Sequence, residues 1–207
     1  MRARLRIISM AQEKIDKIED ILGVIKEPDH FIVYCGDGRV QDNDSEIRHI
    51  QFVMRKLAEL KRKSSQFTAS ENMTERMDLV DAFNIGAIDA LVAIRCLDEG
   101  INIPSIQGAL ILSSNDDYRE FVQRRGRILR MYGNKKSANI YDVIVLPSPM
   151  TPKMAEIELR RYYEYARLAI NNDTLLKDLS RIATQYGLNI SEFVAQYDEG
   201  KERELDD

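Results

Sequence analysis

Apolar and polar positions follow two rhythms along this chain of 207 residues. Short, unbroken apolar runs such as FIVYC at 31–35 predict β-strands that are buried on both faces. Between these runs, apolar residues recur every three or four positions, as Ile15, Ile18 and Leu22 do, which predicts amphipathic helices. The predicted strands are 31–35, 64–70, 89–94, 108–113 and 139–147. The predicted helices are 15–25, 47–57, 74–83 and 117–130, and the third is expected to bury Met77, Val80 and Phe83.

The alternation of strands and helices indicates an α/β fold. Because the predicted strands are apolar throughout, they are expected to form a parallel sheet with helices on both faces. Sheets of this kind bind ligands beyond the carboxyl ends of their strands. The loops that follow Cys35, Thr68, Ile94 and Ser113 are therefore the places where a functional site is expected.

The pattern also suggests how the chain is divided. The segments are 1–28, a helix that Pro28 ends; 29–150, the sheet domain; 151–190, a helical appendage; and 191–207, an acidic tail. The appendage consists of two helices, 153–170 and 173–186, and Gly187 follows the second in a C-terminal cap position. The tail ends in DEGKERELDD and is expected to be solvated and disordered.

Composition excludes several classes of protein. A net charge of −4 with 44% hydrophobic and 31% charged residues is typical of a soluble, cytoplasmic globular protein. No apolar run approaches the ~18 residues needed to cross a bilayer, so no membrane partner is expected. The two cysteines, Cys35 and Cys96, lie in apolar runs and are expected to be reduced core thiols. With two histidines that do not cluster with them, a structural zinc site is not expected.

Four arginines lie within seven positions of this acidic chain, in FVQRRGRILR at 121–130. In a helix over 117–130, Gln123, Arg127 and Arg130 share one stripe, because they are four and three residues apart. Gly126 lets a ligand or another chain approach this helix closely. An amide and two guanidinium groups on one face suit a polyphosphate. The alternative is a set of surface salt bridges with nearby carboxylates, since runs of charge are usually solvated.

Four blocks, in order along the chain, resemble motifs of superfamily-two helicases and translocases. Gln-Arg-x-Gly-Arg-x-x-Arg at 123–130 resembles their sixth motif. LDEGINIP at 97–104 resembles the fifth, in the version found in restriction-enzyme translocases and nucleotide-excision-repair helicases. FIVYCGDG resembles the fourth motif, and FTASENMTERMDLVDAF is similar to a segment between the fourth and fifth. The resemblance implies the second of two RecA-like motor domains of a helicase or translocase that acts on DNA.

The resemblance also implies roles for individual residues around ATP. Arg127 and Arg130 correspond to arginine fingers, which neutralise charge on the transferred phosphoryl group. The residues implied to contact the nucleotide are Gln123, Glu99, Gly100 and Asn102. Asn102 stands where the family usually has an Asp that contacts the ribose. Glu99 has a structural alternative, which is an ion pair with an arginine of the sixth motif.

The loops after the strands are implied to follow the nucleic-acid backbone. Hydroxyl groups, main-chain amides and arginines contact phosphate without reading sequence. The candidates are Gly36, Gly38, Thr68, Ser70 and Arg95. For Thr68 the alternative is a residue at the end of a strand that caps the next turn.

Two motifs that complete such a motor are missing from this sequence. It contains no G-x-x-x-x-G-K-[ST] and no D-E-x-[DH] after a strand. ATP and Mg2+ are therefore expected to bind mainly to a first RecA-like domain of the same parent chain, and the fragment alone is expected to be inactive and to hold no cofactor. The fifth motif also suggests a nuclease or methyltransferase subunit as a partner. The alternative is a non-catalytic RecA-like adaptor that docks nucleic acid or a protein.

Overall fold

The computed structural model describes residues 11–24, 30–42, 45–94, 103–113, 118–146, 152–192 and 194–195. The chain divides into two compact units, Met1–Val143 and Ile144–Asp207, called unit 1 and unit 2 below. Unit 1 carries the β-sheet, and unit 2 carries a pair of helices. Among the helices that the structure describes, none is long and apolar enough to cross a bilayer.

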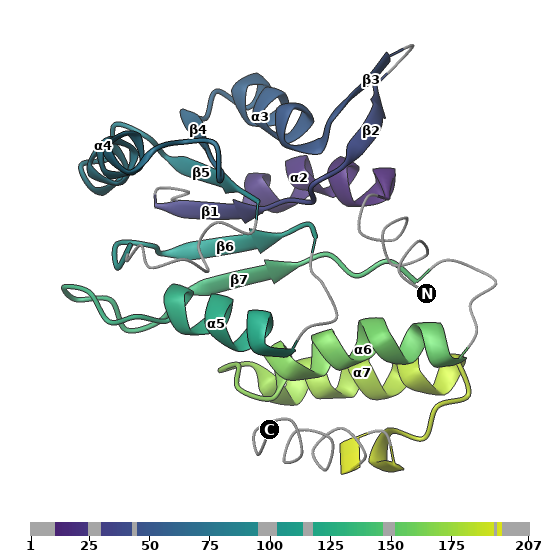
Figure 1. The fold of residues 1–207 in the computed structure, drawn as a ribbon. Coiled ribbons are helices and arrows are strands. Elements are labelled where there is room, and N and C mark those ends of the chain that lie inside the picture. The colour runs from purple at the N-terminus through teal and green to yellow at the C-terminus, as the bar shows by residue number, and fades with distance from the viewer. Residues whose placement is uncertain are drawn as a thin grey trace. The chain divides into compact units, whose positions relative to one another are not determined.

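Unit 1 is built on a five-stranded parallel sheet with β1 at its centre (Figure 1). The strands, in the order β4-β5-β1-β6-β7, are Ser64–Phe67, Ala90–Ala93, Phe31–Tyr34, Gly108–Ile111 and Asn139–Asp142. In this register Phe31 lies opposite Ala90 on one side and Gly108 on the other. Each strand lies inside the segment that was predicted as a strand, so the predicted parallel sheet is confirmed.

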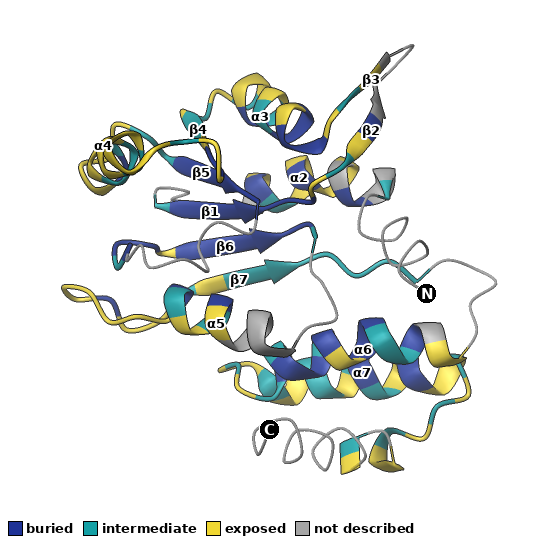
Figure 2. Cartoon of the chain, viewed as in Figure 1, coloured by how far each residue is buried: buried dark blue, intermediate teal, exposed yellow. Residues whose placement is uncertain are grey.

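Helices cover both faces of the sheet, as strands with two apolar faces require. Successive side chains of a strand point to opposite faces, so Val33 and Tyr34 of β1 face different layers. Val33 belongs to a buried cluster with Ile18 of α2 (Gln12–Val24) and Val53 of α3 (His49–Glu59). Tyr34 contacts α5 (Tyr118–Ile128) through Arg124. Figure 2 shows that β1, β5 and β6 are buried along their whole length, so the core follows the middle of the sheet.

An antiparallel hairpin between β1 and α3 is absent from the sequence prediction. It consists of β2 (Arg39–Asp42) and β3 (Ser45–Arg48). The helix expected over 47–57 begins at His49, so the helical assignment of Ile47 is wrong. Ile47 pairs with Val40 across the hairpin, and its apolar character reflects this strand pair rather than a turn of helix.

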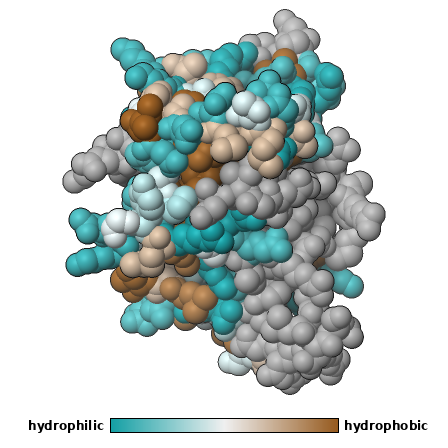
Figure 3. Space-filling view, turned by 60° about the vertical axis from the view of Figure 1, so that its left-hand side comes forward, coloured by the Kyte–Doolittle hydropathy of each residue, from teal (hydrophilic) through white to brown (hydrophobic). Residues whose placement is uncertain are grey.

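The helix α4 (Met73–Asn84) buries only part of the side that was predicted. Phe83 is completely buried, but Met77 is 61% exposed, so the expected inner position of Met77 is wrong. Leu79, four residues before Phe83, shares its side of the helix, whereas Met77 is rotated by about 120° from Phe83. Apolar residues lie on several sides of this short helix, so their spacing does not show which side is buried. The surface view that brings the α4 side forward accordingly shows apolar patches set among polar ones (Figure 3).

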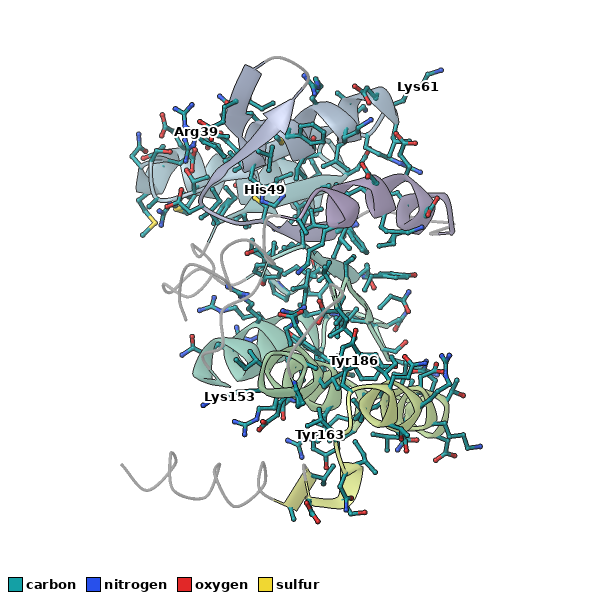
Figure 4. The ribbon with its side chains drawn as sticks, turned by 90° about the vertical axis from the view of Figure 1, so that its right-hand side faces the viewer. Arg39, His49, Lys61, Lys153, Tyr163 and Tyr186 are labelled. Carbon is teal, nitrogen blue, oxygen red and sulfur yellow. The ribbon has the colours of Figure 1, made fainter. Side chains whose placement is uncertain are left out.

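Unit 2 contains α6 (Pro152–Ala166) and α7 (Asn172–Gln185), which pack against each other. Gly187 follows α7 with a φ of +69°, a left-handed conformation that favours glycine, so its predicted capping position is confirmed. The Tyr186 hydroxyl donates a hydrogen bond of 3.2 Å to the Leu146 carbonyl, which ties the chain before α6 to the end of α7 (Figure 4). Residues 196–207 lie outside the described part of the chain, so the disordered tail stays a prediction.

Candidate functional site

The predicted site residues fall into two groups with respect to the structure. Seven lie in the described part of the chain: Gly36, Gly38, Thr68, Ser70, Gln123, Arg127 and Arg130. The other four, Arg95, Glu99, Gly100 and Asn102, lie outside the described residues. The first four of the described residues belong to loops after β1 and β4, which leave the sheet at the carboxyl edge of the parallel strands.

A buried histidine holds the loop that follows β1. The Gly36 amide donates a hydrogen bond of 3.0 Å to Nδ1 of His49, and the His49 amide donates one of 2.8 Å to the Gly38 carbonyl. The imidazole is completely buried in unit 1, whereas Arg39 of the adjacent hairpin is exposed (Figure 4). The Gly36 N–H is used in this bond, so Asp37, which is exposed, and Gly38, which is half-buried, present this loop to a ligand.

The chemistry of His49 follows from its surroundings. Burial, helped by the nearby ammonium group of Lys14, lowers the pKa of His49 from 6.5 to about 4. Protonation of Nδ1 would also break the hydrogen bond from Gly36. His49 is therefore neutral at pH 7, with its proton on Nε2, and this nitrogen has no hydrogen-bond partner among the described residues. Sequence reasoning missed His49, since a single histidine before an apolar helix carries no motif.

Glu71 organises the loop that follows β4. The Thr68 hydroxyl donates to Oε2 of Glu71 at 2.8 Å, and the Thr68 amide donates to the same oxygen. Burial acts to raise the pKa of Glu71, but hydrogen bonds from Thr68, the Glu71 amide and Gln66 together outweigh this effect, and the pKa is lowered. The Arg76 guanidinium donates to the Thr68 carbonyl at 2.9 Å from the other side. Thr68 therefore has the geometry of the turn-capping alternative, while the side chain of Ser70 is exposed.

Two side chains anchor α5 to the sheet. Arg124 is 4% exposed, and its guanidinium lies 5.0 Å from the centre of the Tyr34 ring. Its Nη1 is 3.5 Å from the carbonyl of Ser113, two residues after the end of β6. Ile128, four residues further along, is completely buried on the same side of the helix. One of the four clustered arginines thus serves the packing of α5 and is not free to reach a ligand.

The buried side of α5, which carries Arg124 and Ile128, determines where the predicted stripe of Gln123 and Arg127 lies. Gln123 and Arg127 each precede an anchoring residue by one position, so they are rotated about 100° from the buried side of α5. Gln123 is exposed and Arg127 is half-buried. Arg125 lies on the other flank, about 160° from Arg127. The structure therefore brings Gln123 and Arg127 together on one flank of α5 and separates Arg125 from them.

The C-terminal end of α5 differs from the prediction. The helix expected over 117–130 ends at Ile128, so Arg130 follows the helix rather than forming its last turn. Arg130 is exposed, and its amide is 3.5 Å from the Arg127 carbonyl, which continues the winding of the chain. A methyl group added at Gly126 would meet no atom within 4 Å in the described structure. The helix is thus open to close approach at Gly126, as the sequence suggested.

The two candidate regions are separate in unit 1. The helix α5 connects two adjacent parallel strands, β6 and β7, so it runs back along the sheet from the carboxyl edge towards the amino edge (Figure 1). Arg127 and Arg130 are at its far end, away from the loops after β1 and β4. The flank of α5 offers amide and guanidinium donors, which suit an anion such as a polyphosphate. Among the described residues, no group of three or more His, Cys, Asp or Glu side chains could hold a metal ion.

Sequence comparison finds relatives of this chain among helicases and translocases. The sequence profile of the helicase conserved C-terminal domain matches residues 13–132. The DNA 3'-5' translocase XPB2 of Sulfurisphaera tokodaii is 29% identical over 126 residues, which cover 61% of this chain and 25% of the translocase. The chain spans only 17% and 25% of the lengths of the curated relatives that it matches.

Solved structures share the fold at low sequence identity. A variant of the C-terminal domain of Dbp5 from S. cerevisiae, bound to a Gle1 variant and IP6, matches with a TM-score of 0.52 and 17% identity over 83% of this chain and 92% of that one. The C-terminal part of the Fun30 ATPase domain matches with a TM-score of 0.51 and 15% identity over 77% and 55%. These likenesses show a RecA-like fold. Because the profile covers more than half of the sequence, the chain belongs to the helicase conserved C-terminal domain family.

Proposed function

We propose that this chain is the second motor domain of an ATP-dependent DNA helicase or translocase. In this role Arg127 and Arg130 act as arginine fingers on an ATP molecule that is held mainly by a first RecA-like domain. The observation that carries the proposal is the placement of α5. Arg124 and Ile128 are buried against the sheet, so the helix is held in one orientation with Gln123 and Arg127 on its neighbouring flank.

The chemistry of the flank fits this role. A guanidinium group is planar and permanently charged, and its forked donors match phosphate oxygens. Charge on the transferred phosphoryl group grows in the transition state, so a finger placed there stabilises that state more than bound ATP. Gln123 holds the triphosphate through its amide. The donors on this flank do not suit Mg2+, which prefers oxygen ligands, so we expect the first domain to supply the carboxylates for the metal.

The loops at the carboxyl edge are proposed to contact the nucleic-acid backbone. Gly38 and Ser70, an exposed residue whose hydroxyl also pairs with the Thr68 hydroxyl at 2.5 Å, are the contacts proposed here. Gly36 and Thr68 give these loops their shape through hydrogen bonds with His49 and Glu71. The similarity to a DNA translocase favours DNA over RNA as the nucleic acid.

The remaining proposals rest on the fifth motif. Glu99, Gly100 and Asn102 are proposed to contact the nucleotide. Arg95, which comes two residues after β5 and before this motif, is proposed to contact the nucleic-acid backbone, as the other loops after strands are. The restriction-type form of this motif motivates a search for a nuclease or methyltransferase subunit that copurifies with the parent protein.

The proposal is tested by ATP hydrolysis in a parent protein that includes the first domain. Arg127→Ala and Arg130→Ala should each lower kcat by at least ~10²-fold, since arginine fingers contribute about 10³–10⁵ in rate. The KM for ATP should change much less, because the contact strengthens in the transition state. Arg125→Ala is the matched control on the other flank of the same helix and should change kcat little.

Two outcomes would contradict the arginine-finger assignment. If Arg125→Ala were as damaging as Arg127→Ala, or if Arg127→Ala hydrolysed ATP normally, the cluster would dock a partner, as the adaptor alternative predicts. The chain by itself should hydrolyse no ATP above background, with or without DNA. Turnover by the chain alone that Arg127→Ala abolished would show that no first domain is needed.

A further inference from the structure

Lys135 is a buried lysine in the connection between α5 and β7. It is 7% exposed, whereas its neighbour Lys136 is exposed. A tight turn presents it: Gly133 has a φ of +54°, and the Lys135 amide donates a hydrogen bond of 3.0 Å to the Tyr132 carbonyl. This turn directs the lysine side chain back towards the end of α5.

The ammonium group of Lys135 joins two segments that are distant in sequence. Its Nζ donates hydrogen bonds to the carbonyl of Ile128 and to the carbonyl of Ile106. Ile128 is the last residue of α5, and Ile106 lies two residues before β6. Lys135 therefore connects the C-terminal end of α5 to the amino edge of the central sheet.

This position is favourable for a cation. The last carbonyl groups of a helix lack partners within the helix and carry partial negative charge, so an ammonium group there is stabilised. Burial by itself lowers the pKa of Lys135, and the two carbonyl oxygens favour its charged form. Within the described part of the chain no carboxylate forms an ion pair with Lys135, so the two main-chain carbonyls are its anchors.

The anchored carbonyl lies between the two proposed fingers. Ile128 directly follows Arg127 and precedes Arg130 by two residues. Arg124 holds the middle of α5, and Lys135 holds the end of the helix from which both fingers extend. Motion of this end would move both guanidinium groups relative to a bound phosphate, and misplacement of a catalytic group by ~1 Å can cost about 10²-fold in rate.

We propose that Lys135 is a positioning residue that fixes the end of α5 and thereby places Arg127 and Arg130 for catalysis. This inference rests on the proposed function for its consequence in ATP hydrolysis. The anchoring of α5 itself does not depend on that function.

The anchoring is tested in this chain by hydrogen exchange. Lys135→Met should make the amides of Leu129 and Arg130 exchange at least ~10-fold faster, because the end of α5 loses a charge-assisted hydrogen bond. Amides of β1 should keep their protection. Lys136→Met, which changes the exposed neighbour, should leave all of these rates unchanged. If Lys135→Met does not fold, Lys135→Gln takes its place with the same expected result, since its amide is neutral and shorter than the lysine side chain and cannot restore the charge-assisted bonds to both carbonyls.

The consequence for catalysis is tested in the longer parent protein. The Lys135 variant should lower kcat for ATP by roughly 10-fold to 10²-fold. The KM should change less than about threefold. A general loss of folded protein would also lower the apparent kcat at constant KM, and the retained protection of the β1 amides excludes that cause.

Unchanged exchange at the end of α5 would overturn the anchoring. Faster exchange with normal kcat would overturn the role in catalysis. If the unaltered parent did not hydrolyse ATP, the proposed function would fail, while the exchange rates would still decide whether Lys135 holds the helix.

Discussion

Acidification should destabilise unit 1 through a single histidine, His49. Its pKa is about 4 in the folded chain and close to the ordinary 6.5 once the chain unfolds. The unfolded state therefore takes up a proton at a pH where the folded state does not. The contribution of uncharged His49 to the free energy of unfolding is fully present above pH 6.5 and is lost as the pH falls towards 4.

The size of the effect follows from the gap between the two pKa values. Each unit of difference between the two pKa values corresponds to about 1.4 kcal/mol. From neutral to strongly acidic pH, protonation of His49 in the unfolded chain should therefore lower the free energy of unfolding by about 3 kcal/mol in total. Between pH 7 and pH 5, where few carboxylates have yet been protonated, the loss from His49 alone should be about 2 kcal/mol.

The assay compares urea unfolding of the native chain and of His49→Leu at pH 7 and pH 5, followed by circular dichroism. His49→Leu should be less stable at pH 7, because the Gly36 amide loses its acceptor inside the protein. Between pH 7 and pH 5, however, its free energy of unfolding should fall by about 2 kcal/mol less than that of the native chain. His30 and the carboxylates are present in both chains and cancel in this comparison. Equal losses in the two chains would refute the argument, because they would show that His49 takes up its proton equally in the folded and unfolded states.

Three further substitutions test the packing around β1 and α5. Gly108→Ala should lower the unfolding free energy by about 1–3 kcal/mol, because its new methyl carbon would lie 2.5 Å from the Phe31 ring in the present geometry. Gly126→Ala is the matched control, because its added methyl group meets no other atom. In the same urea titration it should raise the unfolding free energy by up to about 1 kcal/mol, since alanine favours a helix more than glycine does. Arg124→Met should lower the unfolding free energy by roughly 2 kcal/mol, since the buried contact with the Tyr34 ring is lost. An unchanged unfolding free energy would contradict the anchoring of α5.

The central strands of unit 1 were predictable because a strand that is buried on both faces must be apolar, and this is visible in the sequence. A strand such as Ala90–Ala93 must be apolar at every position, and that run is visible without knowledge of its neighbours. The shared stripe of Gln123 and Arg127 was visible for a similar reason, since helical spacing alone places them on one side. The exposure of Met77 was not predictable, because apolar residues lie on several sides of α4.

The contacts that shape the candidate site were decided by tertiary structure. Lys135 and Lys136 look alike in the sequence, yet only Lys135 is buried, because the turn at Gly133 directs it towards two main-chain carbonyls. His49 likewise acquires its low pKa only when α2 and the loop after β1 enclose it. Periodicity shows which side of an element is apolar, but these side chains bind main-chain atoms 7 to 29 positions away. Such partners come together only when the whole chain has folded, so local spacing cannot reveal them.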